Sequence, residues 1–431
     1  MERGKALQVV AILLPPFLYS LYRFSIGAFV PTFETTYSIG DAAAGEVISA
    51  SVGLVAVGVF CGGLLAQRYG DFRTIMAGLV VFVVFEAAVV LAGNLAAFSA
   101  VFLAASFGIG LVITPCYGIV AELMPRRRGL GVSIVSTAYS FGGFVGPSLV
   151  GFLLAYRGWD SPFIALAALG AVFTAFIAVM LLKVTRGYKA APVAYLEALR
   201  NRAVVVLAVS GFFADLGFLV FVSWTPKYLI SAFSVTGSGT ATVDSVFGVG
   251  VGLGGVGALM AGVLFDRLGG RRSILISGAL SVVSFLSLYL VESLALALAI
   301  ILAAGFFSNT FWPLMTAMAQ VSARRGQVTS ATSVVQTAGF IGAFVGPGLA
   351  GLIGGAVSTA LIASTVVPYL VFLVVIGGFY RLPRDGVGYN PAPAAEGVEG
   401  DPDHADSQEG QKQTRVLRAQ ERGDGRGQAV L

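Results

Sequence analysis

The sequence consists mainly of apolar segments about 20 residues long, separated by short polar stretches. A helix needs roughly 20 mostly apolar residues to cross the hydrocarbon core of a bilayer. Only 11% of the residues are charged, against roughly a quarter in soluble proteins, so a soluble globular domain is excluded. We predict an all-α integral membrane protein with spans near residues 6–31, 44–66, 74–95, 98–122, 131–156, 161–182, 203–229, 243–265, 273–291, 294–320, 329–354 and 359–380.

These spans predict the organisation of the chain. Residues 1–182 are expected to form a first bundle of six helices and residues 203–380 a second, joined by a polar, basic loop at 183–202. Residues 381–431 are rich in Gly, Pro and charge without apolar periodicity, so they are expected to be a disordered tail.

The basic residues predict the orientation in the membrane. With a cytoplasmic N-terminus, only Arg157 and Lys227 fall in the outer loops. Lys and Arg accumulate in cytoplasmic loops. We therefore expect both termini in the cytoplasm of a prokaryotic cell, with these basic residues on the same side: Arg68, Arg73, Arg126, Arg127, Arg128, Lys183, Arg186, Lys189, Arg200, Arg202, Arg267, Arg271, Arg272, Arg324 and Arg325.

The second half of the sequence repeats the first. Gly146-Pro147 reappears as Gly346-Pro347, each preceded by Phe-Val and followed four residues later by glycine. Two unrelated apolar helices would share Leu and Val rather than Gly-Pro. Since six spans separate the copies, the halves enter the membrane in the same direction and are parallel repeats. We expect these glycines to mediate close helix packing.

A loop between the second and third spans of each half is also repeated. The first copy comprises Gly63, Gln67, Arg68, Gly70, Asp71 and Arg73, and the second comprises Gly262, Asp266, Arg267, Gly269, Arg271 and Arg272. The second copy resembles the G-x-x-x-D-R-x-G-x-R/K-R/K signature of the major facilitator superfamily, with one extra glycine. The resemblance implies a uniporter, symporter or antiporter that rocks two six-helix bundles around a central cavity, and it assigns these loops to gating.

The first-half loop departs from this signature. Gln67 stands where the family favours Asp, and Asp71 where it favours Arg. Gln67 offers only a neutral hydrogen bond, so this half of the gate is expected to be weaker, with Asp71 as a partial substitute. Ala104 stands where many proton-driven drug exporters carry Arg, which argues against a drug–proton antiporter.

Ionisable residues inside a span are costly and are functional candidates by default. Arg23 lies in the first span, beside Tyr19 and Tyr22, and its planar guanidinium matches a carboxylate or phosphate. Asp215 in the seventh span is its expected partner, either as a structural ion pair or as a proton-coupling group. If they pair, a substrate carboxylate competes with Asp215 for Arg23, and protonation of Asp215 releases it.

The remaining candidates are weaker. Glu86 in the third span is a coupling candidate, but a hydrogen bond to a neighbouring helix is the favoured interpretation. Polar and aromatic residues on the expected cavity helices complete the predicted substrate site: Tyr117, Tyr139, Asn309, Trp312 and Gln336.

The function expected from these features is secondary active transport of a small organic anion, such as a carboxylate. The alternatives are an exporter or permease of a neutral or cationic compound, drug-like or sugar-like, and, from another class, a transporter-like sensor. We expect a small-molecule substrate, a coupled proton or counter-substrate, and a monomer in the lipid bilayer. We expect no enzyme activity, cofactor, metal or nucleic acid, because the spans contain no nucleophile–base pair or metal-ligand cluster.

Overall fold

The computed structural model describes residues 3–123, 128–181, 195–323 and 328–381, which are helical almost throughout. The first half contains α1 (Arg3–Phe24), α2 (Ile26–Tyr37), α3 (Asp41–Tyr69), α4 (Asp71–Ala88), α5 (Leu95–Gly110), α6 (Ile113–Leu123), α7 (Arg128–Arg157) and α8 (Ser161–Leu181). The second contains α9 (Tyr195–Leu199), α10 (Arg202–Ala232), α11 (Ser238–Leu268), α12 (Gly270–Leu290), α13 (Leu294–Ser308), α14 (Phe311–Ser322), α15 (Val328–Leu352), α16 (Ser358–Leu361) and α17 (Val367–Phe379). Short 3-10 and π segments follow α4 and α16.

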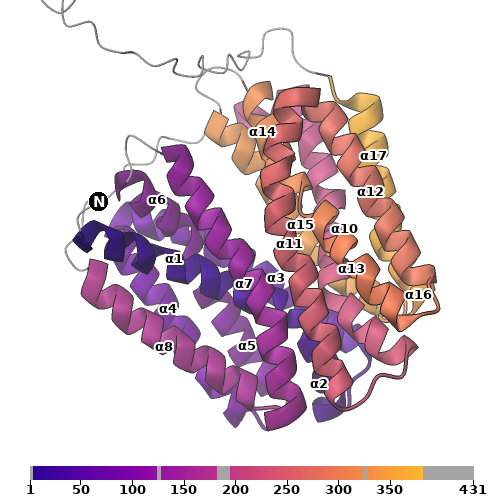
Figure 1. The fold of residues 1–431 in the computed structure, drawn as a ribbon. Coiled ribbons are helices and arrows are strands. Elements are labelled where there is room, and N and C mark those ends of the chain that lie inside the picture. Colours follow the sequence, from indigo (N-terminus) through magenta and orange to yellow (C-terminus); the bar gives the residue numbers. More distant parts are fainter. Residues whose placement is uncertain (1–2, 124–127, 182–194, 324–327, 382–431) are drawn as a thin grey trace, which may run out of the picture. The chain divides into compact units, whose positions relative to one another are not determined.

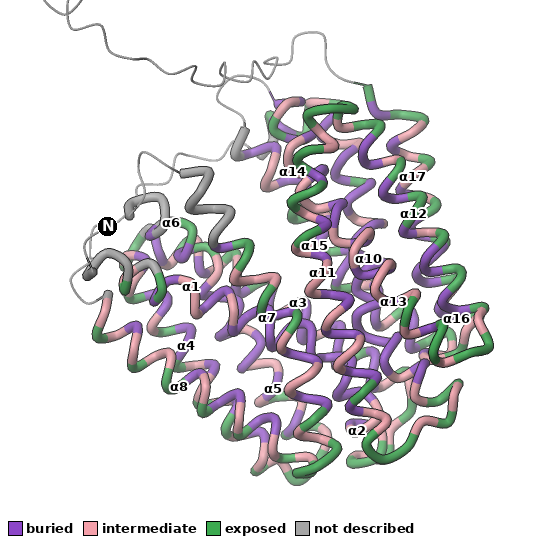
Figure 2. The backbone as a smooth tube through the Cα atoms, viewed as in Figure 1, coloured by how far each residue is buried: buried purple, intermediate pink, exposed green. Residues whose placement is uncertain are grey.

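In these residues, eleven helical segments are long and apolar enough to span a membrane, and the bent pair α1–α2 makes a twelfth. This confirms the all-α membrane fold of two parallel six-helix bundles. Most of the predicted loop 183–202 and almost all of the predicted tail 381–431 lie outside the described residues. Large apolar side chains such as Val179, Val283 and Val374 are exposed on α8, α12 and α17, and Figure 2 shows exposed residues along the outer faces of these helices. Such faces suit contact with lipid.

The first span is bent, which the apolar pattern did not predict. The axes of α1 and α2 differ by 48° across Ser25. Ser25 Oγ donates a hydrogen bond to the Leu21 carbonyl at 2.6 Å, and such bonds bend helices. Pro31 has no N–H to bond one turn back, which loosens the helix further. Arg23 therefore lies at the bend itself.

The fourth and tenth spans are interrupted at equivalent places. The break after α5 precedes Pro115, and the break after α13, at Asn309 and Thr310, precedes Pro313. A proline inside a helix removes one backbone hydrogen bond and clashes with the preceding turn.

The repeated glycines pack the two halves in the same way. A side chain at Gly146 would collide with the Leu21 carbonyl of α1, and one at Gly346 with the Leu216 carbonyl of α10. Each glycine lets the fifth span of its half lie directly on the backbone of the first span.

The two bundles meet through α7 against α11, α3 against α15 and α2 against α10. Figure 1 shows α7 and α11 side by side where the first and second bundles adjoin. Ser49 Oγ of α3 accepts a hydrogen bond of 2.6 Å from the backbone N–H of Gly348 in α15. The halves are therefore in direct contact around a common centre.

Candidate functional site

The centre of the site is Arg23, which is 9% exposed. Its Nη1 donates to the Tyr19 hydroxyl one turn earlier at 2.9 Å. Its guanidinium carbon lies 5.8 Å from the centre of the Phe340 ring, which belongs to α15 of the other bundle. Nε is buried without a hydrogen-bond partner. Arg23 therefore faces the second bundle and keeps hydrogen-bonding capacity that the protein does not use.

Asp215 faces Arg23 from α10 without forming a direct ion pair. The two side chains interact electrostatically. Asp215 Oδ1 accepts a hydrogen bond of 3.0 Å from Trp312 Nε1, while Oδ2 is buried without a partner. A cation and an anion with unused bonding capacity thus face one another across the contact between the bundles.

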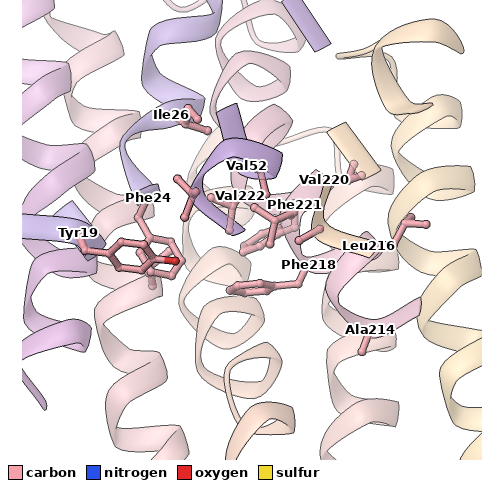
Figure 3. Packing of buried hydrophobic residues seen from close by; sticks show 14 of the residues in the cluster. Tyr19, Phe24, Ile26, Val52, Ala214, Leu216, Phe218, Val220, Phe221 and Val222 are labelled. Atoms are coloured by element: carbon pink, nitrogen blue, oxygen red, sulfur yellow. The ribbon is translucent and has the colours of Figure 1, made fainter. Parts of the chain in front are cut away.

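A path of aromatic rings connects these two charges. Tyr19 lies 5.8 Å from Tyr139, and Phe24 lies 5.7 Å from Tyr139 and 6.2 Å from Phe218 of α10. The path continues from Phe218 to Phe311 at 5.9 Å and on to Trp312. Figure 3 shows Tyr19, Phe24 and Phe218 within this packed region. Most of these rings are buried, so the path packs the two bundles together around the two charges.

Two other predicted residues stay near the site. Tyr117 is 40% exposed and interacts electrostatically with Tyr19 and Tyr139. Gln336 is exposed on α15, one turn before Phe340 and on the same helix face. Both can present polar groups to a bound molecule.

Two predicted residues face elsewhere. Tyr22 points into the first bundle, where its hydroxyl pairs with Ser106 at 2.8 Å and its ring packs on Phe82. Asn309 Nδ2 donates to the Gly305 carbonyl at 2.9 Å in the broken tenth span, and its side chain presses on Gly254. Tyr22 points away from Arg23 because one residue of helix turns a side chain by about 100°.

The environment of Glu86 differs from the predicted one, which was a hydrogen bond to a neighbouring helix. It is fully buried in α4, and neither carboxyl oxygen has a hydrogen-bond partner. The expected hydrogen bond to a neighbouring helix is therefore wrong. The nearby Tyr22 interacts with it electrostatically, and both lie inside the first bundle, away from Arg23.

The repeated gating loops are tight turns. Gly70 and Gly269 have φ of 90° and 78°, and each N–H bonds back to the helix that it ends. Positive φ explains glycine at both positions. Asp71 is buried at the start of α4, while Asp266 and Arg267 are exposed. The proposed compensation of Gln67 by Asp71 stays a prediction. A cavity of about 340 Å³ beside Arg271 and Arg272 lies at this end, apart from Arg23.

Sequence reasoning missed a polar cluster that joins the bundles at the opposite end of the spans. Lys227 of α10 forms ion pairs of 2.5 Å with Glu34 of α2 and with Asp41 of α3. Asp41 also accepts a hydrogen bond from the backbone N–H of Ala356 at 3.2 Å. We call Lys227, Glu34 and Asp41 the outer cluster. Lys227 is one of two basic residues in the predicted outer loops, and this rarity was the sequence feature that could have revealed the cluster.

Gly339 was also missed. It occupies the position in α15 that Tyr139 occupies in α7, and a side chain there would lie 2.6 Å from Asp215 Oδ2 and 2.8 Å from Trp312. The site is therefore asymmetric: one bundle contributes a tyrosine where the other leaves space for an acid and an indole. Aligning the repeats would have revealed this difference.

The sequence profile of the Major Facilitator Superfamily matches residues 16–347 and 207–419. The chain belongs to this superfamily. It is similar to the gallate transporter of Pseudomonas putida, with 26% identity over 310 residues, which are 62% of this chain and 68% of that protein. It is also similar to the cis,cis-muconate transport protein of Acinetobacter baylyi, with 22% identity over 282 residues, which are 60% and 65% of the two chains.

Solved structures support the same fold. A bacterial homologue of the lysosomal transporter Spinster, inward-facing and unoccupied, aligns with a TM-score of 0.70 at 14% identity, covering 88% of this chain and 97% of the other. The nucleoside transporter NupG aligns with a TM-score of 0.72 at 14% identity, covering 88% and 100%. The protein is a multi-pass membrane transporter, and its relatives and structural neighbours are transporters rather than enzymes.

Proposed function

We propose that this superfamily member is a secondary active transporter that moves a small organic carboxylate across the cytoplasmic membrane by alternating access, with both termini in the cytoplasm. The observation that carries the proposal is Arg23, a buried guanidinium that faces the opposite bundle with an unpartnered Nε. A buried charge without a full set of partners is costly. A bound carboxylate supplies the missing partner and fits the planar donors.

The rings around Arg23 favour an aromatic or conjugated acid. Tyr19, Tyr139 and Phe340 offer flat surfaces beside the guanidinium, so the acid's π-system packs while its carboxylate binds Arg23. Gallate and muconate, named for two relatives, are conjugated acids. Tyr117, Gln336 and Trp312 then orient the polar substituents.

Asp215 supplies the coupling in this proposal. As an ionised group it attracts Arg23 and competes with the substrate carboxylate. Proton binding to Asp215, or exchange against a second anion, releases Arg23. The transported acid is thus coupled to a proton or to a counter-substrate.

Export or permeation of a cationic compound is a second candidate, favoured by one observation. Asp215 Oδ2 is buried and unpartnered beside the Trp312 indole, and an acid next to an aromatic face suits an organic amine. The chain is also 26% identical, over 175 residues, to a multidrug resistance protein of Mycobacterium tuberculosis, covering 40% of this chain and 32% of that one.

A thermal-shift screen of the purified protein separates these candidates. A ligand that binds the native state raises the melting temperature. We expect aromatic and dicarboxylic acids to raise it, and phosphates, sugars and amines to leave it unchanged. Arg23→Gln removes a charge-assisted contact and should weaken binding of the acid about 10- to 100-fold.

Arg200→Gln is the matched control, because Arg200 is exposed and lies just before α10. In this variant the acid should still raise the melting temperature. Stabilisation by amines alone, abolished by Asp215→Asn, would favour the second candidate. Equal shifts by acids in the wild type and Arg23→Gln would remove Arg23 from the site.

A further inference from the structure

Asp244 is a buried carboxyl group that the proposed transport site does not use. It lies in the second turn of α11, is 3% exposed, and belongs to the contact between the two bundles. A side chain at Gly151 of α7 would overlap Asp244. One turn further along, a side chain at Gly248 would lie 2.6 Å from the Phe144 carbonyl. The helices therefore touch on this face, which leaves no layer of water around Asp244.

Comparing the two halves of the chain shows which residue type this packing position requires. Aligning Gly63 with Gly262 pairs Asp244 of α11 with Gly45 of α3. Gly45 packs on α15 at Pro347 and Gly351, as Asp244 packs on α7 at Gly151. The same packing position thus holds a glycine in one half and an acid in the other. Close packing alone requires only the glycine.

Asp244 also lacks partners for its charge. Oδ1 is buried without a hydrogen-bond partner, and no charged side chain among the described residues acts on the carboxyl group. Among the helices packed on α11, α13 and α14 contain no titratable side chain. The others carry Arg128, Tyr139, Tyr156 and Arg157 on α7, Arg202, Asp215, Lys227 and Tyr228 on α10, and Arg271, Arg272 and Tyr289 on α12. Of the groups whose side chains the structure describes, none forms a hydrogen bond or an ion pair with Asp244.

An unpaired carboxylate is strongly disfavoured in such an interface. We propose that Asp244 is a proton-binding site, and that the α7–α11 interface closes at the outer-cluster end only when Asp244 carries a proton. Separation of α7 from α11 admits water, and the carboxylic acid then releases its proton to that water. Acid on this side therefore favours the closed arrangement. The inference rests on the proposed alternating access, which separates the bundles at this end.

The outer cluster responds to acid in the opposite direction. Protonation of Glu34 or Asp41 weakens their ion pairs with Lys227 and favours opening. The contribution of Asp244 is therefore isolated by comparing variants at the same pH rather than by the pH response of the wild type alone.

The test measures the distance between spin labels across the interface by double electron–electron resonance. Labels are attached at Tyr156→Cys of α7 and Thr242→Cys of α11, both exposed residues, after Cys61→Ala and Cys116→Ala. The full-length protein is examined in lipid nanodiscs without substrate. At acid pH we expect the wild type, Asp244→Asn and Asp244→Gly to show the same short distance, which also verifies that the variants fold.

As the pH rises, the closed state of the wild type should lose population to the open state, because opening releases one proton. Compared with Asp244→Asn at the same pH, the closed-to-open ratio of the wild type should fall by up to about tenfold per pH unit. Asp244→Gly, which places the residue type of Gly45 at this position, should follow Asp244→Asn. Asp160→Asn, at an exposed acid of the same end, should follow the wild type.

The proposal would be overturned if the wild type and Asp244→Asn gave the same distance distribution at every pH. It would also be overturned if Asp244→Gly opened with rising pH as the wild type does. Carboxylate binding by Arg23 is not part of this readout. The thermal-shift screen tests carboxylate binding, and the distance measurement tests Asp244, so either proposal can fail without the other.

Discussion

At the scale of single residues, the site combines opposite charges that are close but not bonded. Arg23 bonds to Tyr19, and Asp215 bonds to Trp312, so each charge is held by its own bundle. Had they formed a direct ion pair, a substrate would have to break it. Their separate anchoring leaves Arg23 Nε and Asp215 Oδ2 without hydrogen-bond partners, as the proposed competition between Asp215 and a substrate carboxylate requires.

The prediction at this scale concerns the pH dependence of binding. Ionised Asp215 competes for Arg23 at higher pH, so an acid that stays ionised throughout should bind more tightly as the pH falls and Asp215 gains a proton. Asp215→Asn is neutral at every pH and should bind the acid about tenfold more tightly than the wild type at high pH. Calorimetric titration across the acidic to alkaline range measures both affinities.

Asp160→Asn, an exposed acid far from Arg23 in sequence, should keep the wild-type pH dependence. An unchanged pH dependence in Asp215→Asn would refute the coupling role. Asp215 would then be a structural partner only.

At the scale of helices, the outer cluster fastens α10 to α2 and α3. Lys227 pairs with two carboxylates from the other bundle, and all three side chains are partly buried. The ring of Trp224, one turn earlier on α10, lies 5.4 Å from the Lys227 ammonium. Such a network fixes the relative position of helix ends more than it stabilises the whole fold.

Lys227→Gln should therefore loosen these helix ends. Removing the ammonium leaves Glu34 and Asp41 repelling one another, and amides of α2 and the first turn of α3 should exchange with deuterium faster. The expected loss of local opening free energy is roughly 1 kcal/mol. Hydrogen–deuterium exchange with mass spectrometry measures it.

Arg157→Gln, at the other predicted outer-loop cation, is the matched control and should leave this exchange unchanged. Equal exchange of α2 and α3 in Lys227→Gln and the wild type would show that the outer cluster does not hold the bundles together.

At the scale of the whole molecule, the sequence predicted the spans and their pairing in two halves. Span length and the repeated Gly-Pro pattern are properties of the linear sequence, and the glycines pack as the repeat implied. The contacts of Arg23 with Phe340 and of Lys227 with Glu34 join residues that are 317 and 193 positions apart. They depend on how the bundles dock, which hydropathy does not encode. The bend at Ser25 similarly depends on local details, the Ser25 hydrogen bond and Pro31, that hydropathy does not encode.

Transport of organic carboxylates by this superfamily member is proposed to depend on Arg23. Counterflow into proteoliposomes tests it most directly, with radiolabelled aromatic and dicarboxylic acids that include gallate and cis,cis-muconate. We expect exchange of at least one acid by the wild type and by Arg200→Gln, and a drop of about tenfold or more in Arg23→Gln. Exchange of amines or sugars but of no acid, or acid exchange that survives Arg23→Gln unchanged, would contradict it.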